Sequence, residues 1–163
     1  MKKIIIAIML ILPMAISAQK FGHINTQELF VQMPEMAQVK LKMDTIQSQY
    51  ESQFTMMYEE LQKKLQDYQA QEATMADAIK QIRQQELQEM QQRIQLFNQT
   101  AEQDVQRKQQ ELLTPIHEKM AKAIKAVGER DGYTYIFDSA AMVHVGADAK
   151  DVTPAVKAEL GIK

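Results

Sequence analysis

Three histidines offer the widest choice of chemistry in this chain, because the sequence contains no cysteine. His117 and Glu118 begin like the helical zinc motif, in which a second histidine four residues after the first completes the metal site. Position 121 is Ala121, so the second ligand is missing and we expect no metal site there. His23 and His144 could face each other across neighbouring strands, although unpaired histidines are the commoner case.

No catalytic or cofactor motif is visible elsewhere in the sequence. The lack of cysteine excludes thiol nucleophiles and disulfides, and none of the five glycines belongs to a phosphate-binding loop followed by Lys and Ser or Thr. We therefore expect no enzyme activity, no catalytic residues, no cofactor and no use of nucleotide. Lys and Arg total 19 against 21 Asp and Glu, for a net charge of -2, which disfavours nucleic acid as a partner.

The N-terminus predicts export. Lys2 and Lys3 form a basic start, residues 4–12 are an unbroken apolar run, and small residues precede Ala18. This pattern is typical of a secretory signal peptide over residues 1–18, cleaved near Ala18. An uncleaved anchor is the less favoured alternative, since a spanning helix needs about 20 apolar residues. Cleavage leaves 17 basic against 21 acidic side chains, a net charge of about -4.

The middle of the chain predicts two long helices, because there is no Gly or Pro between Pro34 and Pro115. One apolar stripe follows an eleven-residue repeat, with members Met43, Ile46, Tyr50, Phe54, Met57, Leu61, Leu65 and Tyr68. A second stripe, broken once at Lys108, has members Leu87, Met90, Ile94, Phe97, Ala101, Val105, Leu112, Ile116, Met120, Ile124 and Val127. Each stripe needs a partner surface, so we expect an antiparallel hairpin arm over residues 35–115.

Local signals place the tip of this hairpin near residues 70–76. Thr74 and Asp77 have the spacing of a capping box, which predicts that the second helix starts at Met75. Pro115 lacks the amide that a helix interior uses, so we expect a kink there.

Strands and short helices are expected at both ends of the chain. Residues 20–24 and 133–137 are rich in strand formers, and residues 142–145 predict a further strand. A capping box at residues 25–28 predicts a short helix to Gln32, and residues 153–154 predict the start of a last helix that ends at Gly161. The long helix is expected to end between Gly128 and Gly132.

These terminal segments, residues 19–34 and 116–163, would form a small β body. Because these few strand residues would bury little apolar surface in a single chain, we expect the body to assemble from several chains. The residues predicted to form the oligomerisation core are Phe21, Ile24, Ile136, Phe137, Val143 and Val145.

The order of these features resembles the Skp/OmpH family of periplasmic chaperones, over essentially the whole chain. The segments that carry the resemblance surround a glutamine-rich hairpin that follows a signal peptide: residues 21–25, 112–116, 132–138 and 151–156. The resemblance implies an α+β fold, predominantly α, in which a long antiparallel helical hairpin emerges from a small β body formed by N- and C-terminal strands. It also implies a homotrimer whose arms enclose a cavity.

The function implied by this resemblance is that of an ATP-independent holdase, which binds unfolded outer-membrane proteins in the periplasm and prevents their aggregation. The best-known members are strongly basic and this chain is not, so contact with lipopolysaccharide or an anionic membrane surface stays open here.

Methionines on the arm suit such a role, because flexible thioethers can contact many different side chains. The predicted client-binding residues are Met36, Met43, Met56, Met57, Met75 and Met90. A methionine on an apolar stripe, such as Met57, packs between the helices more often than it binds a client. Met56 lies one step off the stripe and is better placed to face the cavity between the arms.

The main alternative is an exported coiled-coil spacer or scaffold of the cell envelope, which would not bind unfolded chains. The methionines that lie off the stripes, and strands at both ends, favour a closed oligomer with a binding surface over a filament.

Overall fold

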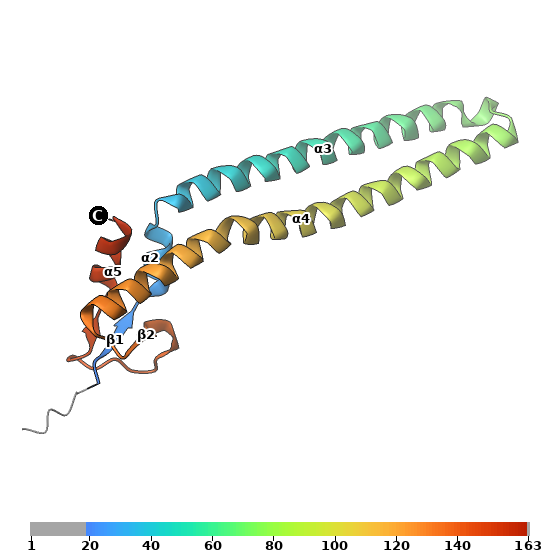
Figure 1. The fold of residues 1–163 in the computed structure, drawn as a ribbon. Helices are drawn as coiled ribbons and strands as arrows, with labels where there is room; N and C mark the ends of the chain where they lie inside the picture. Colours follow the sequence, from blue (N-terminus) through green and yellow to red (C-terminus); the bar gives the residue numbers. More distant parts are fainter. Residues whose placement is uncertain (1–18, 163) are drawn as a thin grey trace, which may run out of the picture. The chain divides into compact units, whose positions relative to one another are not determined.

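The computed structural model describes residues 19–162 of the 163-residue chain. It divides into two compact units, which are coloured along the sequence in Figure 1. The strand unit contains residues 19–29 and 122–161, and the hairpin unit contains residues 30–121. The predicted signal peptide lies outside the described residues. The predicted β body was larger than this strand unit. It included residues 30–34 and 116–121, which belong to the hairpin unit.

The strand unit is built on a three-stranded parallel sheet in the order β2-β1-β3. The N-terminal strand β1 (Phe21–Ile24) lies at the centre, between β2 (Tyr135–Asp138) and β3 (Lys150–Asp151). Phe21 lies opposite Tyr135 in the register, and His23 lies opposite both Phe137 and Asp151. The prediction that strands from both ends of the chain form one small body is confirmed.

One prediction about the strands is wrong. Residues 142–145 form no strand, and the second neighbour of β1 is β3, several residues later. After β2 the chain turns through the 3-10 helix η2 (Ser139–Ala141), whose Ala140 amide donates to Asp138 Oδ1 over 3.0 Å. This turn takes the following segment out of the ladder, and Val143 is fully exposed.

The core of the strand unit lies on one face of the sheet. Its largest fully buried side chains are Ile24, Leu29, Val127, Val152 and Val156. Gly22 lies on the same face, where a Cβ atom would be 2.9 Å from Val152 Cγ1 and 3.0 Å from Tyr133 Cε1. Only glycine therefore lets β1 approach this core so closely.

At the start of each short helix in this unit, a side chain that precedes the helix accepts a hydrogen bond from a backbone amide. The Glu28 amide donates to Asn25 Oδ1 over 3.0 Å at the start of α2 (Thr26–Gln32), as the capping box predicted. At α5 (Thr153–Leu160) the carboxylate of Asp151 accepts from the Thr153 amide over 2.8 Å. Gly161, with φ of 72°, ends α5 as predicted.

The hairpin unit consists mainly of two antiparallel helices, α3 (Glu35–Gln71) and α4 (Asp77–Asp131), of which α4 continues into the strand unit (Figure 1). They are joined by the 3-10 helix η1 (Glu72–Thr74) and two further residues, within the range expected for the tip. α4 runs through Pro115 as one continuous helix and ends just before Gly132, whose φ is 72°. Within the described part of the chain, no helix is both long and apolar enough to span a bilayer.

The start of α4 corrects the predicted capping box. Thr74 lies in η1, and its hydroxyl donates to the carbonyl of Gln71 over 3.0 Å. α4 begins at Asp77, two residues later than predicted, and the Ala76 carbonyl accepts its first helical bonds from Ile79 and Lys80. The Thr74 hydroxyl bonds back to the last residue of α3 and not forward to an amide of α4, so the predicted capping box does not form.

Candidate functional site

The two predicted stripes of the hairpin unit face each other and form its seam. Near the tip, a buried cluster contains Leu61, Tyr68, Leu87, Met90 and Ile94. Further stripe residues pack against this cluster while partly buried, namely Phe54, Met57 and Leu65, together with Met75 from the tip. The eleven-residue spacing therefore identifies the inner face of α3 correctly.

The structure places the six predicted client-binding methionines in different environments. Met90 is 7% exposed in the seam, and Met57 and Met75 pack against the same buried cluster. Met36 and Met43 are half-buried on α3. Met56 is 54% exposed and lies on the outer surface of the hairpin.

Sequence reasoning missed most of the exposed apolar side chains of the hairpin unit. Besides Met56, the large exposed apolar residues of this unit are Val31, Leu41, Tyr58, Ile79, Ile82 and Leu96. Each lies off the two stripes, and that is the signal that identifies them. Two pairs lie close together, Met56 with Tyr58 and Ile79 with Ile82, and the others stand among Gln, Glu, Lys and other polar residues. The surface therefore offers several small, dispersed apolar contacts.

Polar bonds between α3 and α4 fix the register of the hairpin. Tyr50 Oη donates to Asp104 Oδ2 over 2.6 Å, and Lys119 forms an ion pair with Glu35. Fifteen residues separate the two partners on α3, and fifteen separate the two on α4. Gln84 Nε2 also donates to Tyr68 Oη over 2.8 Å nearer the tip. These bonds supply directional contacts that an apolar seam lacks.

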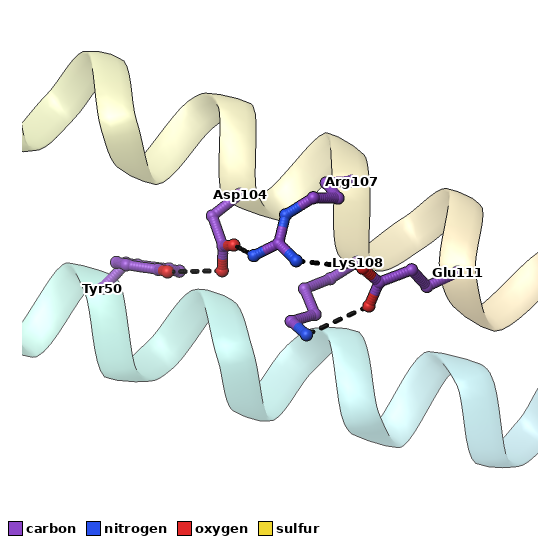
Figure 2. Close-up of polar contacts among 5 residues, drawn as sticks. All are labelled: Tyr50, Asp104, Arg107, Lys108 and Glu111. Carbon is purple, nitrogen blue, oxygen red and sulfur yellow. Dashed lines mark hydrogen bonds and ion pairs between the residues drawn. The ribbon is translucent and has the colours of Figure 1, made fainter.

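A charged network surrounds the Tyr50–Asp104 bond (Figure 2). Asp104 also accepts from Arg107. Glu111 accepts from Arg107 and from Lys108, and both of these distances are 3.0 Å. The hydrogen bond from Tyr50, followed by that from Arg107, holds the pKa of Asp104 below its usual value. The same bond to Asp104 raises the pKa of Tyr50. Both effects favour an ionised Asp104 that accepts from a protonated tyrosine.

Next to this network, the seam opens into a hollow of about 500 Å³, which we call the Lys108 hollow. It lies where Lys108 interrupts the apolar stripe of α4. Its lining combines the apolar side chains of Leu41, Ile46 and Leu112 with polar ones that include Lys42, Lys108 and Glu111. A second depression of about 310 Å³, toward Pro115, shares Lys42, Glu111 and Leu112 with it.

The strand unit carries an exposed aromatic face on the side of the sheet opposite its core. Phe21, Tyr135 and Phe137 stack on one another with ring centroids 5.9–6.3 Å apart. Their exposed fractions are 49%, 56% and 47% respectively. Three stacked, solvent-exposed rings are unusual on a surface that binds no partner, because aromatic side chains gain most from burial.

The predicted oligomerisation residues fall into three groups. Phe21 and Phe137 lie on this aromatic face, and Tyr135 joins them although the sequence reasoning did not select it. Ile24 is buried in the core of the unit, and Ile136 is half-buried on the same side of the sheet. Val143 and Val145 are exposed in the segment that proved not to be a strand.

The histidines have separate environments. His23 Nδ1 lies 3.2 Å from Ser139 Oγ, and the His117 ring stacks on Phe30 with centroids 4.5 Å apart. His144 follows η2 outside the sheet, so it is not a ladder partner of His23. Over residues 19–162, no group of three or more His, Asp or Glu side chains is arranged to hold a metal ion.

A long helical hairpin joined to a small parallel sheet with strands from both chain ends is the architecture of one known class of proteins. The model of the family described as outer membrane protein (OmpH-like) matches residues 20–160. This protein therefore belongs to the OmpH-like family.

Curated relatives carry a more particular name. The chain is 29% identical over 137 residues to the chaperone protein Skp of Pectobacterium atrosepticum, covering 84% of this chain and 82% of that one. It is 26% identical over 140 residues to the chaperone protein Skp of Photorhabdus laumondii, covering 86% and 84% of the two chains.

A solved structure shares the fold. The crystal structure of an OmpH-like outer membrane chaperone from Caulobacter crescentus matches with a TM-score of 0.77 at 20% identity. The match covers 87% of this chain and 83% of that one. The expected membership of the Skp/OmpH family is thus confirmed, and so is the expected α+β, mainly helical fold with a long hairpin and a small strand body.

Proposed function

We propose that this protein is an ATP-independent holdase of the periplasm that binds unfolded outer-membrane proteins and keeps them from aggregating. Residues 1–18 would act as a signal peptide cleaved near Ala18, and the mature chain would assemble as a homotrimer whose arms surround the client. The family membership and the relatives named Skp support the chaperone class. The surface of the hairpin unit supports the holdase mechanism.

The observation that carries this proposal is the dispersed set of exposed apolar side chains on a polar hairpin, such as Leu41, Met56 and Leu96. Strands of outer-membrane barrels alternate apolar and polar residues, so an unfolded client presents apolar side chains at short intervals. Dispersed contacts match this pattern. Each contact is weak alone, and several arms acting together would raise the effective concentration while each contact still releases quickly.

The aromatic face of the strand unit supports assembly. Phe21, Tyr135 and Phe137 would become buried if copies of the chain packed through their sheets. A closed symmetric assembly covers such a face on every copy, whereas an open array would leave one exposed at each end. Three copies is the number that the resemblance implies.

The alternative of an exported structural spacer predicts a different surface. A spacer needs the seam and a polar exterior, and it gains nothing from exposed leucines and methionines between the glutamines. The apolar exterior of the hairpin unit therefore favours the holdase.

An aggregation assay tests the proposal. An outer-membrane β-barrel protein is diluted from urea, without nucleotide, into buffer with or without the mature protein, and light scattering is followed. We expect scattering to fall in proportion to the trimer added. Scattering at the usual rate with excess protein would overturn the proposal and favour the spacer.

A surface variant locates the contact. Replacing Leu41, Met56 and Leu96 with Gln should leave the assembly intact and weaken protection. The matched control changes three exposed polar residues nearby, as Ser48→Gln, Thr55→Gln and Gln95→Asn, and should protect like the wild type. Equal protection by both triple variants would move the client contact to another surface.

A further inference from the structure

The Lys108 hollow exists because the apolar stripe of α4 is broken. Val105 and Leu112 are stripe residues, and the position between them is held by Lys108. A lysine directs its ammonium group to water or to a carboxylate, so it does not fill the seam as a leucine would. Here the Lys108 ammonium group lies 3.0 Å from Glu111 Oε2 (Figure 2). A hollow of about 500 Å³ remains beside this ion pair.

The floor and wall of the hollow are apolar. Ile46 and Leu112 are half-buried stripe residues, and Leu41 is 68% exposed beside them. A volume of about 500 Å³ accommodates one large side chain and part of its backbone, but is too small for a second helix. The apolar surface is therefore suited to a single leucine-sized or phenylalanine-sized group.

The rim of the hollow carries an excess of positive charge. Glu111 is its single acidic lining residue, and this carboxylate already accepts from both Lys108 and Arg107. Lys42, on the opposite helix, forms no ion pair within the described part of the chain. The Lys42 ammonium group can therefore pair with a carboxylate of a bound molecule, although the net charge of the chain is negative.

We propose that the Lys108 hollow binds an unfolded client at a large apolar residue followed by an acidic one. The apolar side chain enters between Leu41, Ile46 and Leu112, and the carboxylate pairs with Lys42. This inference rests on the proposed holdase function and adds a preferred client segment to it. An extended backbone suits the open hollow because it can present one side chain without unfolding the hairpin.

Peptide binding to the full mature protein tests this inference. The probes are fluorescein-labelled nonapeptides of Gly and Ser with a central Phe-Asp, Phe-Asn, Phe-Lys or Ser-Asp pair, and the readout is fluorescence anisotropy at low salt. We expect the Phe-Asp peptide to bind most tightly, the Phe-Asn peptide more weakly, and the Phe-Lys and Ser-Asp peptides most weakly. No saturable binding, or equal binding of all four, would overturn the proposal.

Two variants separate the apolar and the charged contributions. Lys108→Leu restores the stripe and fills the hollow, so it should raise the melting temperature and weaken Phe-Asp binding by about tenfold. Lys42→Gln should remove the preference for Phe-Asp over Phe-Asn and leave Phe-Asn binding unchanged. The control Lys63→Gln, an exposed α3 lysine outside the hollow, should change neither.

The outcomes distinguish this inference from the holdase function. Wild-type peptide affinity in Lys108→Leu, together with intact client protection, would remove the hollow as the site and leave the holdase standing. Failure of the wild-type protein to prevent client aggregation would remove the holdase itself. Displacement of the Phe-Asp peptide by dodecanoate at lower concentration than by unlabelled peptide would overturn the proposal in favour of a lipid site.

Discussion

At the scale of single residues, the glycine in the central strand shows how closely the strand unit is packed. Gly22 has Val152 and Tyr133 on the side where a Cβ atom would be. Gly146 has nothing within 4 Å of the same position and no positive φ, so it provides a matched control.

We expect Gly22→Ala to destabilise the protein by about 1–3 kcal/mol, because overpacking forces the core or the strand to shift. Gly146→Ala should be neutral or slightly stabilising, since it restricts the unfolded chain without a clash. Urea unfolding followed by circular dichroism measures both. Equal stability of Gly22→Ala and wild type would show that β1 does not lie this close to the core.

Methionines that look alike in the sequence have different roles in the structure. Met90 is buried in the seam, and Met56 is exposed one step off the stripe of α3. Spacing on the stripe separates these two, but Met75 could not be assigned in this way. It lies at the tip, where the helical period stops, and packs against the seam through the turn.

We expect Met90→Gln to lower the melting temperature of the protein, because burial of an amide without partners costs about 1–3 kcal/mol. Met56→Gln should leave the melting temperature unchanged and reduce client protection slightly. Thermal unfolding and the aggregation assay, run on the same two variants, compare the roles. A stable Met90→Gln variant would contradict its place in the seam.

Residues that assemble into surfaces were the hardest to predict at this scale. Tyr135 was not selected for the oligomerisation core, although it alternates with Phe137 along β2. Leu41 was missed because exposure of an apolar residue is decided by which face of α3 the partner helix covers. The pairing of Tyr50 with Asp104 needs the register of the hairpin, which no local pattern contains.

At the scale of helices and strands, the long-range apolar periods were reliable, whereas two of the short strands were predicted wrongly or missed. The stripes of α3 and α4 repeat over many turns, so a few irregular positions do not hide the pattern. The strand expected at residues 142–145 failed because β-branched residues alone do not supply a ladder partner. β3 has only two residues, Lys150 and Asp151, and its composition gives no strand signal.

The Tyr50–Asp104 bond between α3 and α4 leads to a prediction about acid. The hydrogen bond from Tyr50 is the main cause of the low pKa of Asp104. At pH values above the usual aspartate pKa, the ionised carboxylate therefore stabilises the hairpin. This contribution is lost as the pH falls through the lowered pKa of the folded state. In Tyr50→Phe this contribution is smaller. We expect the melting temperature of the variant to fall less than that of wild type between about pH 7 and about pH 2.

Circular dichroism at a series of pH values measures this effect. Tyr58→Phe is the control, because Tyr58 is an exposed tyrosine on the same helix with no hydrogen bond through its hydroxyl in the structure. It should keep the acid sensitivity of the wild type. Identical pH profiles for Tyr50→Phe and wild type would show that the cross-helix bond does not contribute in solution.

At the scale of the whole molecule, the proposed function assigns assembly to the strand unit and client contact to the hairpin unit. The aromatic face of Phe21, Tyr135 and Phe137 is left uncovered by the other described residues, 19–162, of a single chain. The prediction that strands from both ends form one body could be made from sequence. The number of copies could not, because it depends on the angle between neighbouring sheets.

We expect Phe137→Glu to dissociate the assembly, because a carboxylate would replace one ring of the aromatic face that the proposed assembly buries. The helices should remain folded, since the hairpin seam is untouched. Light scattering coupled to size exclusion measures the mass, and circular dichroism measures the helix content. Val31→Glu, which charges an exposed apolar residue of the hairpin unit, is the control and should retain the wild-type mass.

The most direct test of the holdase is sedimentation velocity of the mature protein mixed with one equivalent of an unfolded outer-membrane protein, without nucleotide. We predict one complex whose mass is that of three subunits plus one client, and a three-subunit species when the client is omitted. A single well-folded subunit at micromolar concentration, or a client that pellets while the protein stays behind, would contradict both the assembly and the function proposed for it.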